Sequence, residues 1–344
     1  MIGTVPTAEP LGATLQPLVG KRILITGGGG FLGGGIRRRL ATLGCRLVCL
    51  QRRAPSADES GEADWHRISL GEGADLAPLM TGCDLVIHTA AKAGVWGSWD
   101  SYVIPNVRGT DEVLRGCRAA GVGALLFTSS PSVVFDGHDE VAIDESVPYP
   151  KQWLGHYSHT KALAEQAVLA ASDLRVAALR PHLIWGSGDP HLIPRVVERG
   201  RRGRLRLVGD GGNRVDSTYI DNAVDAHLLA AADLLSTGRS SGRAFFISNG
   251  EPWSMRKLLD AILAAYDLPP VRRRVGPNLA YGIGVACEVL YRLLGLRHEP
   301  PLTAFVARQL ATEHFFDITA AGRAFGYRPR IALNDGFRRL RAAR

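Results

Sequence analysis

The sequence predicts an α/β fold: a doubly wound parallel sheet with a smaller, mostly helical C-terminal cap. Three observations predict it. Short apolar runs alternate with helix-patterned segments through the first half of the chain, and a glycine-rich turn follows the first run. After Pro181 this alternation gives way to loops rich in Gly, Pro and Arg. The alternation is typical of a parallel sheet that binds ligands at the carboxyl ends of its strands.

The expected strands are short and are bounded by Gly, Asp or Ser; they are Ile23–Thr26, Leu47–Leu50, Leu85–His88, Leu125–Ser129, Val176–Leu179 and Ala244–Ser248. Helical patterns cover Thr110–Ala120, Tyr157–Ala171 and a segment near Ile193–Arg201. Leu279–Leu296 is the most apolar helical stretch. It contains Glu288 and Arg292 and barely reaches the roughly 20 residues that a membrane span needs, so we expect no transmembrane segment.

Composition excludes several classes of protein. At 344 residues the chain is long enough for one large or two modest domains. The net charge is 41 − 33 = +8, carried mostly by arginine. No basic run is interleaved with aromatic residues, so nucleic acid is not the expected partner; anionic small molecules or assembly partners are. The five cysteines show no metal-ligand spacing and indicate reduced thiols of a cytoplasmic protein.

The glycine-rich turn predicts dinucleotide binding. Gly27, Gly30 and Gly33 lie between the first strand and a helix, where backbone amides and the helix N-terminus can bind a pyrophosphate. This turn identifies the sheet as Rossmann-type. We therefore expect a flexible leader at 1–20, a dinucleotide-binding domain at 21–186 with returning segments at about 214–250, and a mainly substrate-binding cap at 187–344.

The end of the second strand indicates which dinucleotide is bound. An acid is expected there in a protein that binds NAD through its ribose hydroxyl. This strand instead ends in Gln51, Arg52 and Arg53. Arginine can bind a 2′-phosphate through two hydrogen bonds, so the sequence favours NADP(H), unless these arginines are only a solvated loop.

Tyr157 and Lys161 form the candidate catalytic pair. Their i,i+4 spacing places the phenol and the ammonium on one helix face. A nearby cation lowers the pKa of a tyrosine, which is otherwise about 10. Ser130 follows the fourth strand and can donate a hydrogen bond to a carbonyl oxygen while Tyr157 transfers the proton.

From residue 21 onward the chain resembles the extended short-chain dehydrogenase/reductase superfamily. The stretches that carry the resemblance are TGGGGFLG (26–33), HTAA (88–91), NVRGT (106–110), and LRP (179–181) with Trp185 and Gly186. The resemblance implies a triad of Ser130, Tyr157 and Lys161, and cofactor contacts from Gly27, Gly30, Phe31, Leu32, Gly33, Ala90, Ala91, Asn106, Tyr157, Lys161 and Pro181. Ile68-Ser69-Leu70 departs from the pattern, because the superfamily usually has an acid there that contacts the adenine.

Within the superfamily, three stretches resemble the 3β-hydroxysteroid and sterol-4-carboxylate dehydrogenase branch: SSPSVVFDG (129–137), LRPHLIWGSGDP (179–190) and FFISNGEPW (245–253). Three others are similar to the bacterial 2-alkyl-3-oxoalkanoate reductases of long-chain olefin biosynthesis: AAKAGVWGSWDSY (90–102), VDSTYIDNA (215–223) and EPPLTAFVARQLATEH (299–314). The resemblance implies NADPH-dependent reduction of a β-keto acid at carbon 3. It further implies that Lys161 holds the ribose, a homodimer, and assembly with other enzymes of that pathway.

Such a substrate is an anion with two alkyl chains. Expected apolar lining comes from Val95, Trp96, Trp99 and the Leu279–Leu296 helix with Tyr281 and Tyr291, unless that helix is only a core element of the cap or an interface. Arg214 or His182 is a candidate for the carboxylate contact. Histidines 88, 156, 159, 182 and 191 lack the spacing of a ligand set, so no metal is expected.

Three other functions remain open. A steroid or sterol dehydrogenase would use the same residues in the oxidative direction. A nucleotide-sugar epimerase would bind NAD tightly and show no net turnover of cofactor, but Arg52, Arg53 and the apolar cap disfavour it. A non-enzymatic redox-sensing protein could dispense with Tyr157 and Lys161, and this chain keeps both.

Overall fold

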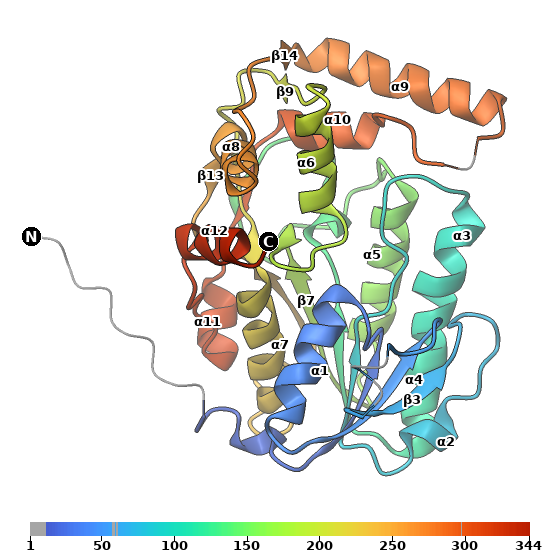
Figure 1. The fold of residues 1–344 in the computed structure, drawn as a ribbon. Helices are drawn as coiled ribbons and strands as arrows, with labels where there is room; N and C mark the ends of the chain where they lie inside the picture. Colours follow the sequence, from blue (N-terminus) through green and yellow to red (C-terminus); the bar gives the residue numbers. More distant parts are fainter. Residues whose placement is uncertain (1–11, 57–58, 60, 297) are drawn as a thin grey trace, which may run out of the picture.

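The computed structural model describes residues 12–56, 59, 61–296 and 298–344. Its centre is a seven-stranded sheet in the order β12-β7-β5-β4-β1-β2-β3, and every neighbouring pair is parallel (Figure 1). The strands are β1 (Arg22–Thr26), β2 (Arg46–Gln51), β3 (Asp64–Arg67), β4 (Leu85–His88), β5 (Ala124–Thr128), β7 (Arg175–Pro181) and β12 (Arg243–Ile247). The predicted Rossmann-type sheet is therefore confirmed.

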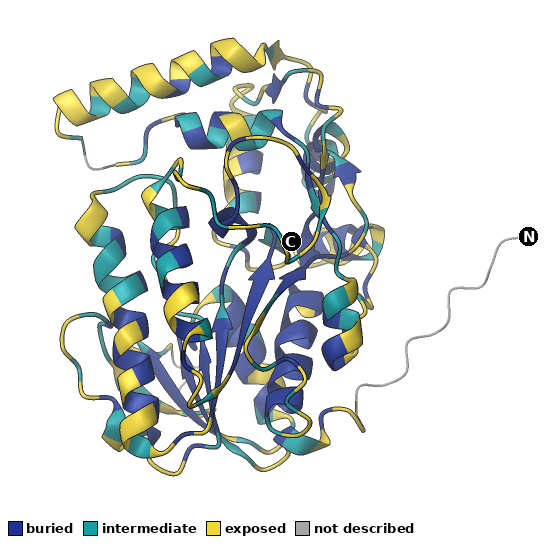
Figure 2. Cartoon of the chain, turned by 180° about the vertical axis from the view of Figure 1, so that it is seen from behind, coloured by how far each residue is buried: buried dark blue, intermediate teal, exposed yellow. Residues whose placement is uncertain are grey.

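Helices cover both faces of this sheet. On one face α1 (Phe31–Ala41) packs against α7 (Ile220–Leu234), and on the other α4 (Gly109–Ala120) packs against α5 (His156–Leu169) and the short α2 (Ala77–Met80). Apolar side chains fill the interior on each side of the strands, which are the dark blue centre of Figure 2. Burial on both faces explains why these strands read as continuous apolar runs.

Two features differ from the sequence expectations. The edge strand β3 contains Asp64, His66 and Arg67, so it lacks the apolar run by which the other strands were predicted. Within the expected leader, Leu15 precedes the 3₁₀ turn Gln16–Leu18 and Leu18 ends it. Both side chains are fully buried in the core. Residues 1–11 of that leader lie outside the described residues.

The cap is built from short pieces at the carboxyl end of the sheet. A four-stranded sheet has the order β13-β10-β15-β6, and two further pairs are β8–β11 and β9–β14. These strands are β6 (Glu140–Ile143), β8 (Ile184–Trp185), β9 (Leu207–Val208), β10 (Arg214–Val215), β11 (Thr218–Tyr219), β13 (Trp253–Ser254), β14 (Arg274–Val275) and β15 (His314–Phe316). The remaining helices are α3 (Trp99–Val103), which leads through a π turn (Ile104–Arg108) to α4, and α6 (Leu192–Arg201), α8 (Met255–Ala265), α9 (Pro277–Leu293), α10 (Ala304–Ala311), α11 (Thr319–Phe325) and α12 (Leu333–Ala342).

Helix α9 lies along the outer surface of the cap and packs on α10 (Figures 1 and 2). Its inner face contains the buried Ala280 and Gly284. Its outer face is apolar and exposed; the large side chains there are Leu279, Ile283, Val289, Leu290 and Leu293. Among the described residues, no helix combines the length and apolarity that crossing a bilayer requires.

Candidate active site

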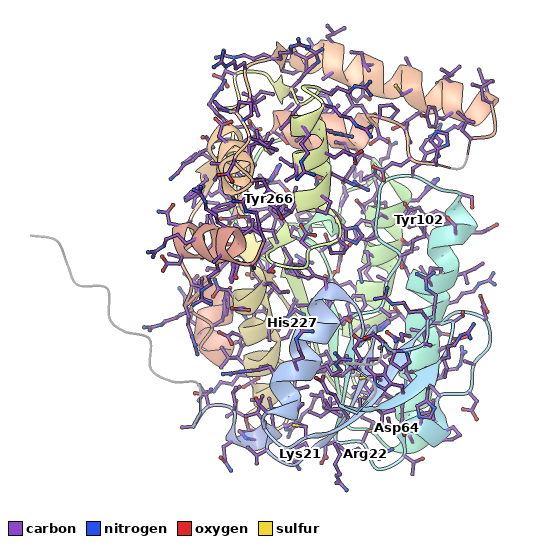
Figure 3. The ribbon with its side chains drawn as sticks, viewed as in Figure 1. Lys21, Arg22, Asp64, Tyr102, His227 and Tyr266 are labelled. Carbon is purple, nitrogen blue, oxygen red and sulfur yellow. The ribbon has the colours of Figure 1, made fainter. Side chains whose placement is uncertain are left out.

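A cavity of about 780 Å³ lies at the carboxyl ends of β1, β2, β4, β5 and β7. This is the edge of a parallel sheet where ligands bind. In Figure 3, Lys21 and Arg22 mark the opposite edge, where β1 begins. With the exception of Asn106, the predicted cofactor and catalytic residues all line the cavity: Gly27, Gly30, Phe31, Leu32, Gly33, Arg52, Arg53, Ala90, Ala91, Ser130, Tyr157, Lys161 and Pro181.

The glycine turn between β1 and α1 has no room for side chains. Gly27 has a φ of +73°, and a Cβ there would lie 2.9 Å from Thr89 Oγ1. A Cβ on Gly33 would collide with the carbonyl oxygen of Gly27. The turn therefore keeps the N-terminus of α1 open to an anion. Because the same cavity continues from this turn to Tyr157, its residues fit an extended nicotinamide dinucleotide.

Arg52 and Arg53 follow β2 and are exposed at the cavity. Arg53 Nη2 donates a hydrogen bond of 3.0 Å to the carbonyl oxygen of Gly29. Among the described residues, neither guanidinium forms an ion pair, so both have donors for a phosphate. At the departure noted in the sequence, Ile68 and Leu70 give the cavity an apolar wall.

Helix α5 carries Tyr157 and, one turn later, Lys161. Lys161 Nζ donates a 2.7 Å hydrogen bond to the carbonyl oxygen of Thr128, which ends β5. One further turn along, Glu165 forms a buried ion pair with Arg180 of β7, with 2.6 Å between Oε1 and Nη2. These two contacts fix α5 against the sheet, so the positions of the phenol and the ammonium follow from the fold.

Burial governs the ionisation of the candidate catalytic pair, Tyr157 and Lys161. It raises the pKa of Tyr157, although the neighbouring Ser130 hydroxyl partly lowers it. Burial also lowers the pKa of Lys161 to about 7. From the spacing alone we expected Lys161 to lower the pKa of Tyr157. In the cofactor-free chain that pKa instead lies above its ordinary value. The ammonium of Lys161 is partly neutralised and is bonded to Thr128.

A buried histidine contacts Thr128, the residue to which Lys161 is hydrogen-bonded. His227 of α7, labelled in Figure 3, has Nδ1 at 2.7 Å from the carbonyl oxygen of Ala223, so Nδ1 carries the hydrogen. Its Nε2 then accepts from Thr128 Oγ1 at 2.9 Å. Burial lowers the pKa of His227 to about 4, which keeps the ring neutral. His227 thus orients the residue whose carbonyl holds Lys161.

Two hydroxyl groups follow β5. Ser130 begins the 3₁₀ turn Pro131–Val133, and its Oγ accepts from the backbone N–H of Ser132 at 3.3 Å. Ser129 also lines the cavity, and its buried Oγ has no hydrogen-bond partner among the described residues. Either hydroxyl can donate to a carbonyl oxygen placed beside Tyr157.

Asn106 does not line the cavity, and its predicted cofactor contact stays a prediction. The side chain is buried and clamps the backbone of Lys92: Oδ1 accepts from the Lys92 N–H at 2.7 Å, and Nδ2 donates to the Lys92 carbonyl oxygen at 3.2 Å. Nδ2 also donates to Thr160 Oγ1 of α5 at 3.1 Å. Asn106 therefore ties the loop after β4 to α5.

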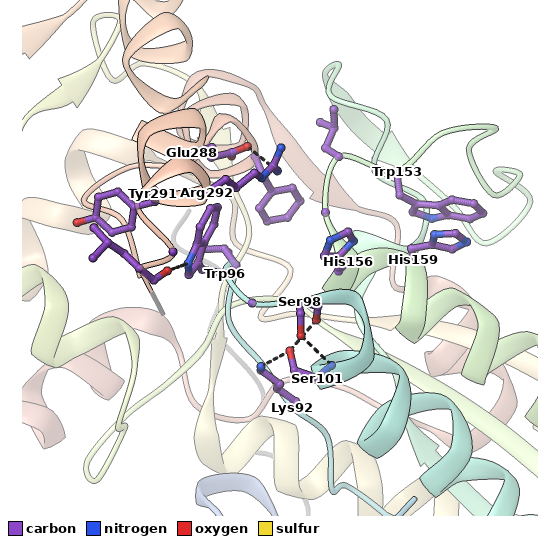
Figure 4. A pocket seen from close by; sticks show the side chains of 17 residues that line it. Lys92, Trp96, Ser98, Ser101, Trp153, His156, His159, Glu288, Tyr291 and Arg292 are labelled. Atoms are coloured by element: carbon purple, nitrogen blue, oxygen red, sulfur yellow. Dashed lines mark hydrogen bonds and ion pairs between the residues drawn. The ribbon is translucent and has the colours of Figure 1, made fainter. Parts of the chain in front are cut away.

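A second cavity of about 870 Å³ lies between α9 and the N-terminal end of α5 (Figure 4). It shares Lys92 with the first cavity. Of the predicted substrate lining, Val95, Trp96 and Tyr291 line it, whereas Trp99 and Tyr281 do not. Further lining includes the aromatic side chains of Trp153, His156, His159 and Phe305.

Neither residue suggested for the carboxylate contact lines either of these cavities. Arg214 forms an exposed ion pair with Glu313 at 2.8 Å. His182 is buried, with Nε2 at 2.9 Å from His314 Nδ1, and burial lowers its pKa well below the ordinary value. A neutral imidazole in the interior cannot bind an anion by charge. Both suggestions are therefore wrong, because a position near a motif does not fix the direction of a side chain.

Three titratable residues that line the first cavity were not assigned to it from the sequence, namely Lys92, Asp189 and His191. Asp189 begins α6 by accepting from the backbone N–H groups of His191 and Ile193, both at 2.8 Å. Lys92 had a visible signal, because it is one of few lysines in an arginine-rich chain. Over the described ranges, no three His, Cys, Asp or Glu side chains gather as a metal site would require.

Comparison with known proteins places this site in a family context. A model of the 3-beta hydroxysteroid dehydrogenase/isomerase family matches residues 24–275. A 2-alkyl-3-oxoalkanoate reductase of Stenotrophomonas maltophilia is 48% identical over 94% of this chain and 99% of its own length. One from Shewanella oneidensis is 46% identical over 93% and 85%. A decarboxylating sterol-4-alpha-carboxylate 3-dehydrogenase of Mus musculus is 30% identical over 93% and 90%.

Solved structures share the fold at lower identity. The epimerase Mth375 of Methanothermobacter thermautotrophicus has a TM-score of 0.75 at 19% identity, covering 97% of this chain and 96% of its own. MoeE5 in complex with UDP-glucose and NAD has a TM-score of 0.71 at 24% identity, covering 93% and 97%. At these identities the likeness concerns the architecture alone.

Proposed function

This chain belongs to the 3-beta hydroxysteroid dehydrogenase/isomerase family and is an oxidoreductase acting on CH–OH or carbonyl groups; we propose that it reduces a β-keto acid. The proposed substrate is a 2-alkyl-3-oxoalkanoate, the product is the 2-alkyl-3-hydroxyalkanoate, and the cofactor is NADPH. The proposed setting is long-chain olefin biosynthesis. The identity of 46–48% to curated reductases of that name, spread over most of both chains, supports the substrate class.

One observation carries this proposal. The three catalytic candidates line one cavity with the glycine turn, and an aromatic cavity adjoins it at Lys92. The first cavity suits a dinucleotide and the ketone carbon. The second is wide enough for alkyl chains and is lined by apolar groups such as Trp96 and Phe305.

Each catalytic residue has a defined task. Tyr157 donates its phenolic proton to the oxygen on carbon 3 as the ketone becomes an alcohol. Ser130 donates a hydrogen bond to the same oxygen and so stabilises the negative charge that develops there. Lys161 binds the cofactor ribose and, when protonated, stabilises the phenolate that Tyr157 leaves. When bound, the reduced nicotinamide supplies the hydride.

Reduction also protects the carboxylate. In a β-keto acid, the ketone can accept the electron pair released when carbon dioxide is lost. Converting the ketone to an alcohol removes that acceptor. A pathway that needs the carboxylate later therefore gains a stable intermediate.

Steady-state kinetics with purified protein test the proposal. With a 2-alkyl-3-oxo acid, the oxidation of NADPH is followed. With a 3β-hydroxysteroid or a UDP-sugar, the reduction of the oxidised cofactor is followed. We expect turnover of the keto acid and a loss of about 10²–10⁴-fold in kcat for Tyr157→Phe. Tyr266→Phe, at the end of α8, is the matched control and should retain wild-type rates. Wild-type rates in Tyr157→Phe would refute the proton transfer.

The second candidate is a decarboxylating dehydrogenase of sterol carboxylates. The mouse relative at 30% identity favours it. This reaction runs in the oxidative direction, so Tyr157 would act as the base. Turnover of the 3β-hydroxysteroid with NAD(P)⁺, without turnover of the keto acid, would establish it in place of the first proposal.

A further inference from the structure

Lys92 occupies the junction between the two cavities. It lies in the loop after β4, and it is the one residue, among those described, that lines both cavities. Figure 4 shows it at the second cavity, beside Ser101. A ligand that extends from the first cavity into the second must pass beside it.

The ammonium of Lys92 is held in place, and none of the described carboxylates pairs with it. Nζ donates to Ser101 Oγ at 2.6 Å, and Ser101 Oγ donates onward to the Ser98 carbonyl oxygen at 2.6 Å. Nζ also lies 4.4 Å from the ring centre of Tyr102. Within the described part of the chain, no carboxylate comes within ion-pair distance of it. An ammonium has three donors, so two remain for a ligand.

This placement is built into the loop. Asn106 clamps the Lys92 backbone from both sides and also bonds to Thr160, three residues after Tyr157. Gly97 has a φ of +148°, and a Cβ there would lie 2.8 Å from Lys92 Nζ and 2.8 Å from Ser101 Oγ. Any larger residue at position 97 would therefore displace the ammonium.

The other cationic side chains around the cavities either have hydrogen-bond or ion-pair partners of their own or lie at the end of β2. Lys161 is bonded to Thr128, and Arg292, on α9, lies 3.4 Å from Glu288. Arg52 and Arg53 lie at the end of β2, beside the glycine turn. Burial and, as a smaller contribution, the positive charge of Arg52 lower the pKa of Lys92, so an anion beside it would recover charge stabilisation that the free protein lacks.

We propose that Lys92 binds the carboxylate of the substrate, so that the ketone lies toward Tyr157 and the alkyl chains extend into the aromatic cavity. This inference rests on the proposed function and assigns a specificity-determining contact within the same site. The ligand is recognised as an anion at carbon 1, beside a neutral carbonyl at carbon 3. A neutral analogue of the same shape would lose this contact.

The test compares a 2-alkyl-3-oxo acid with its methyl ester in four variants. For Lys92→Met we expect the KM of the acid to rise about 30-fold, while kcat and the KM of the ester change less than about 3-fold. Lys92→Arg should restore part of the affinity for the acid. Gly97→Ala should also raise the KM of the acid, because its Cβ would lie 2.8 Å from Nζ and the ammonium would have to move. Lys151→Met, an exposed lysine elsewhere, is the matched control and should behave as wild type.

NADPH binding, measured by fluorescence titration, provides a readout that the inference predicts to be unchanged in Lys92→Met. A KM that rises equally for acid and ester, or for neither, overturns the carboxylate contact while leaving the proposed function intact. Wild-type protein that reduces neither compound overturns both. A loss of NADPH affinity that parallels the loss of activity would assign Lys92 to the cofactor and overturn the inference.

Discussion

At the scale of single residues, we propose that Arg52 and Arg53 are the groups by which the site selects NADPH over NADH. At these positions an acidic residue would repel a 2′-phosphate, whereas an arginine can bind it. Neither arginine forms an ion pair with an acidic side chain among the described residues. We expect wild-type protein to bind NADPH more tightly than NADH. Arg52→Ala should weaken NADPH binding by about 10–100-fold and leave NADH binding unchanged, since only NADPH carries the extra phosphate.

Dissociation constants for both cofactors, measured on wild type and variant, check this expectation. Arg272→Ala removes an exposed arginine from the cap and serves as the control for the overall loss of positive charge. An NADPH-to-NADH ratio that is the same in wild type and Arg52→Ala would show that these arginines are only solvated.

Most of the residues that line the first cavity could be predicted, because short motifs fix their places at strand ends or at the start of α5. Gly27, Ser130 and Tyr157 each lie within a stretch whose spacing has a chemical meaning. Lys92 and Asn106 could not be assigned in this way, because their roles depend on a clamp between a loop and α5 that spacing does not encode. Arg214 and His182 failed for the same reason: sequence gives proximity along the chain but not direction.

At the scale of elements, the seam between α9 and α10 depends on one glycine. A Cβ on Gly284 would lie 2.6 Å from the Thr303 carbonyl carbon and 2.7 Å from the Ala304 nitrogen. These are backbone atoms and cannot rotate away. Gly282, half a turn earlier, lies on the other side of the helix, and a Cβ there would meet open space, with no atom within 4 Å.

We therefore expect opposite effects from two equal substitutions. Gly282→Ala should raise the free energy of unfolding by about 0.5–1 kcal/mol through helix propensity. Gly284→Ala should lower it by about 1–3 kcal/mol, because α9 must move off α10. Urea unfolding of both variants measures the difference. Equal effects would mean that the two helices are not packed as described.

The buried strands of the sheet layer and its helices α1, α4 and α5 were predictable because burial gives each a regular apolar pattern. Helix α7 was not predicted; nearly all of its residues are buried, so it has no polar face to reveal a helical period. The cap was harder. Its strands β8, β9, β10, β11, β13 and β14 have two residues each, too few to show any alternation. Their positions follow from long-range pairing, such as Arg214 with Ser254, which local sequence does not reveal.

At the scale of the whole molecule, the buried Lys161 makes stability depend on pH. Its pKa is about 7 in the folded chain and about 10.4 when unfolded, so the unfolded state binds more protons between these values. The free energy of unfolding therefore carries a penalty from this group at low pH, and the penalty is relieved as pH rises from about 7 to 10.

Lys161→Met removes that penalty. Without cofactor, we expect Lys161→Met to have a higher free energy of unfolding than wild type, and this difference should be largest near pH 6. Above about pH 7 the difference should shrink by up to about 1.4 kcal/mol per pH unit. Urea unfolding at about pH 6, 7.5 and 9 measures this difference. Lys151→Met should show no such trend, and a difference that is constant with pH would contradict the burial of a titrating ammonium.

The whole-molecule expectations of a homodimer, of assembly with pathway enzymes and of cytoplasmic location stay predictions. The exposed apolar face of α9 is compatible with the interface role considered from the sequence, and size measurements in solution address it directly.

The polar strand β3 has a consequence for how copies of this protein behave toward one another. A sheet ends in two borders, and each border presents unpaired backbone groups that could recruit a neighbouring chain. One border here is β3, whose Asp64 and Arg67 place charge along that edge, and α11 packs beside the other, β12. Intermolecular β-addition is thereby discouraged at both rims, which guards a crowded solution of folded molecules against aggregation.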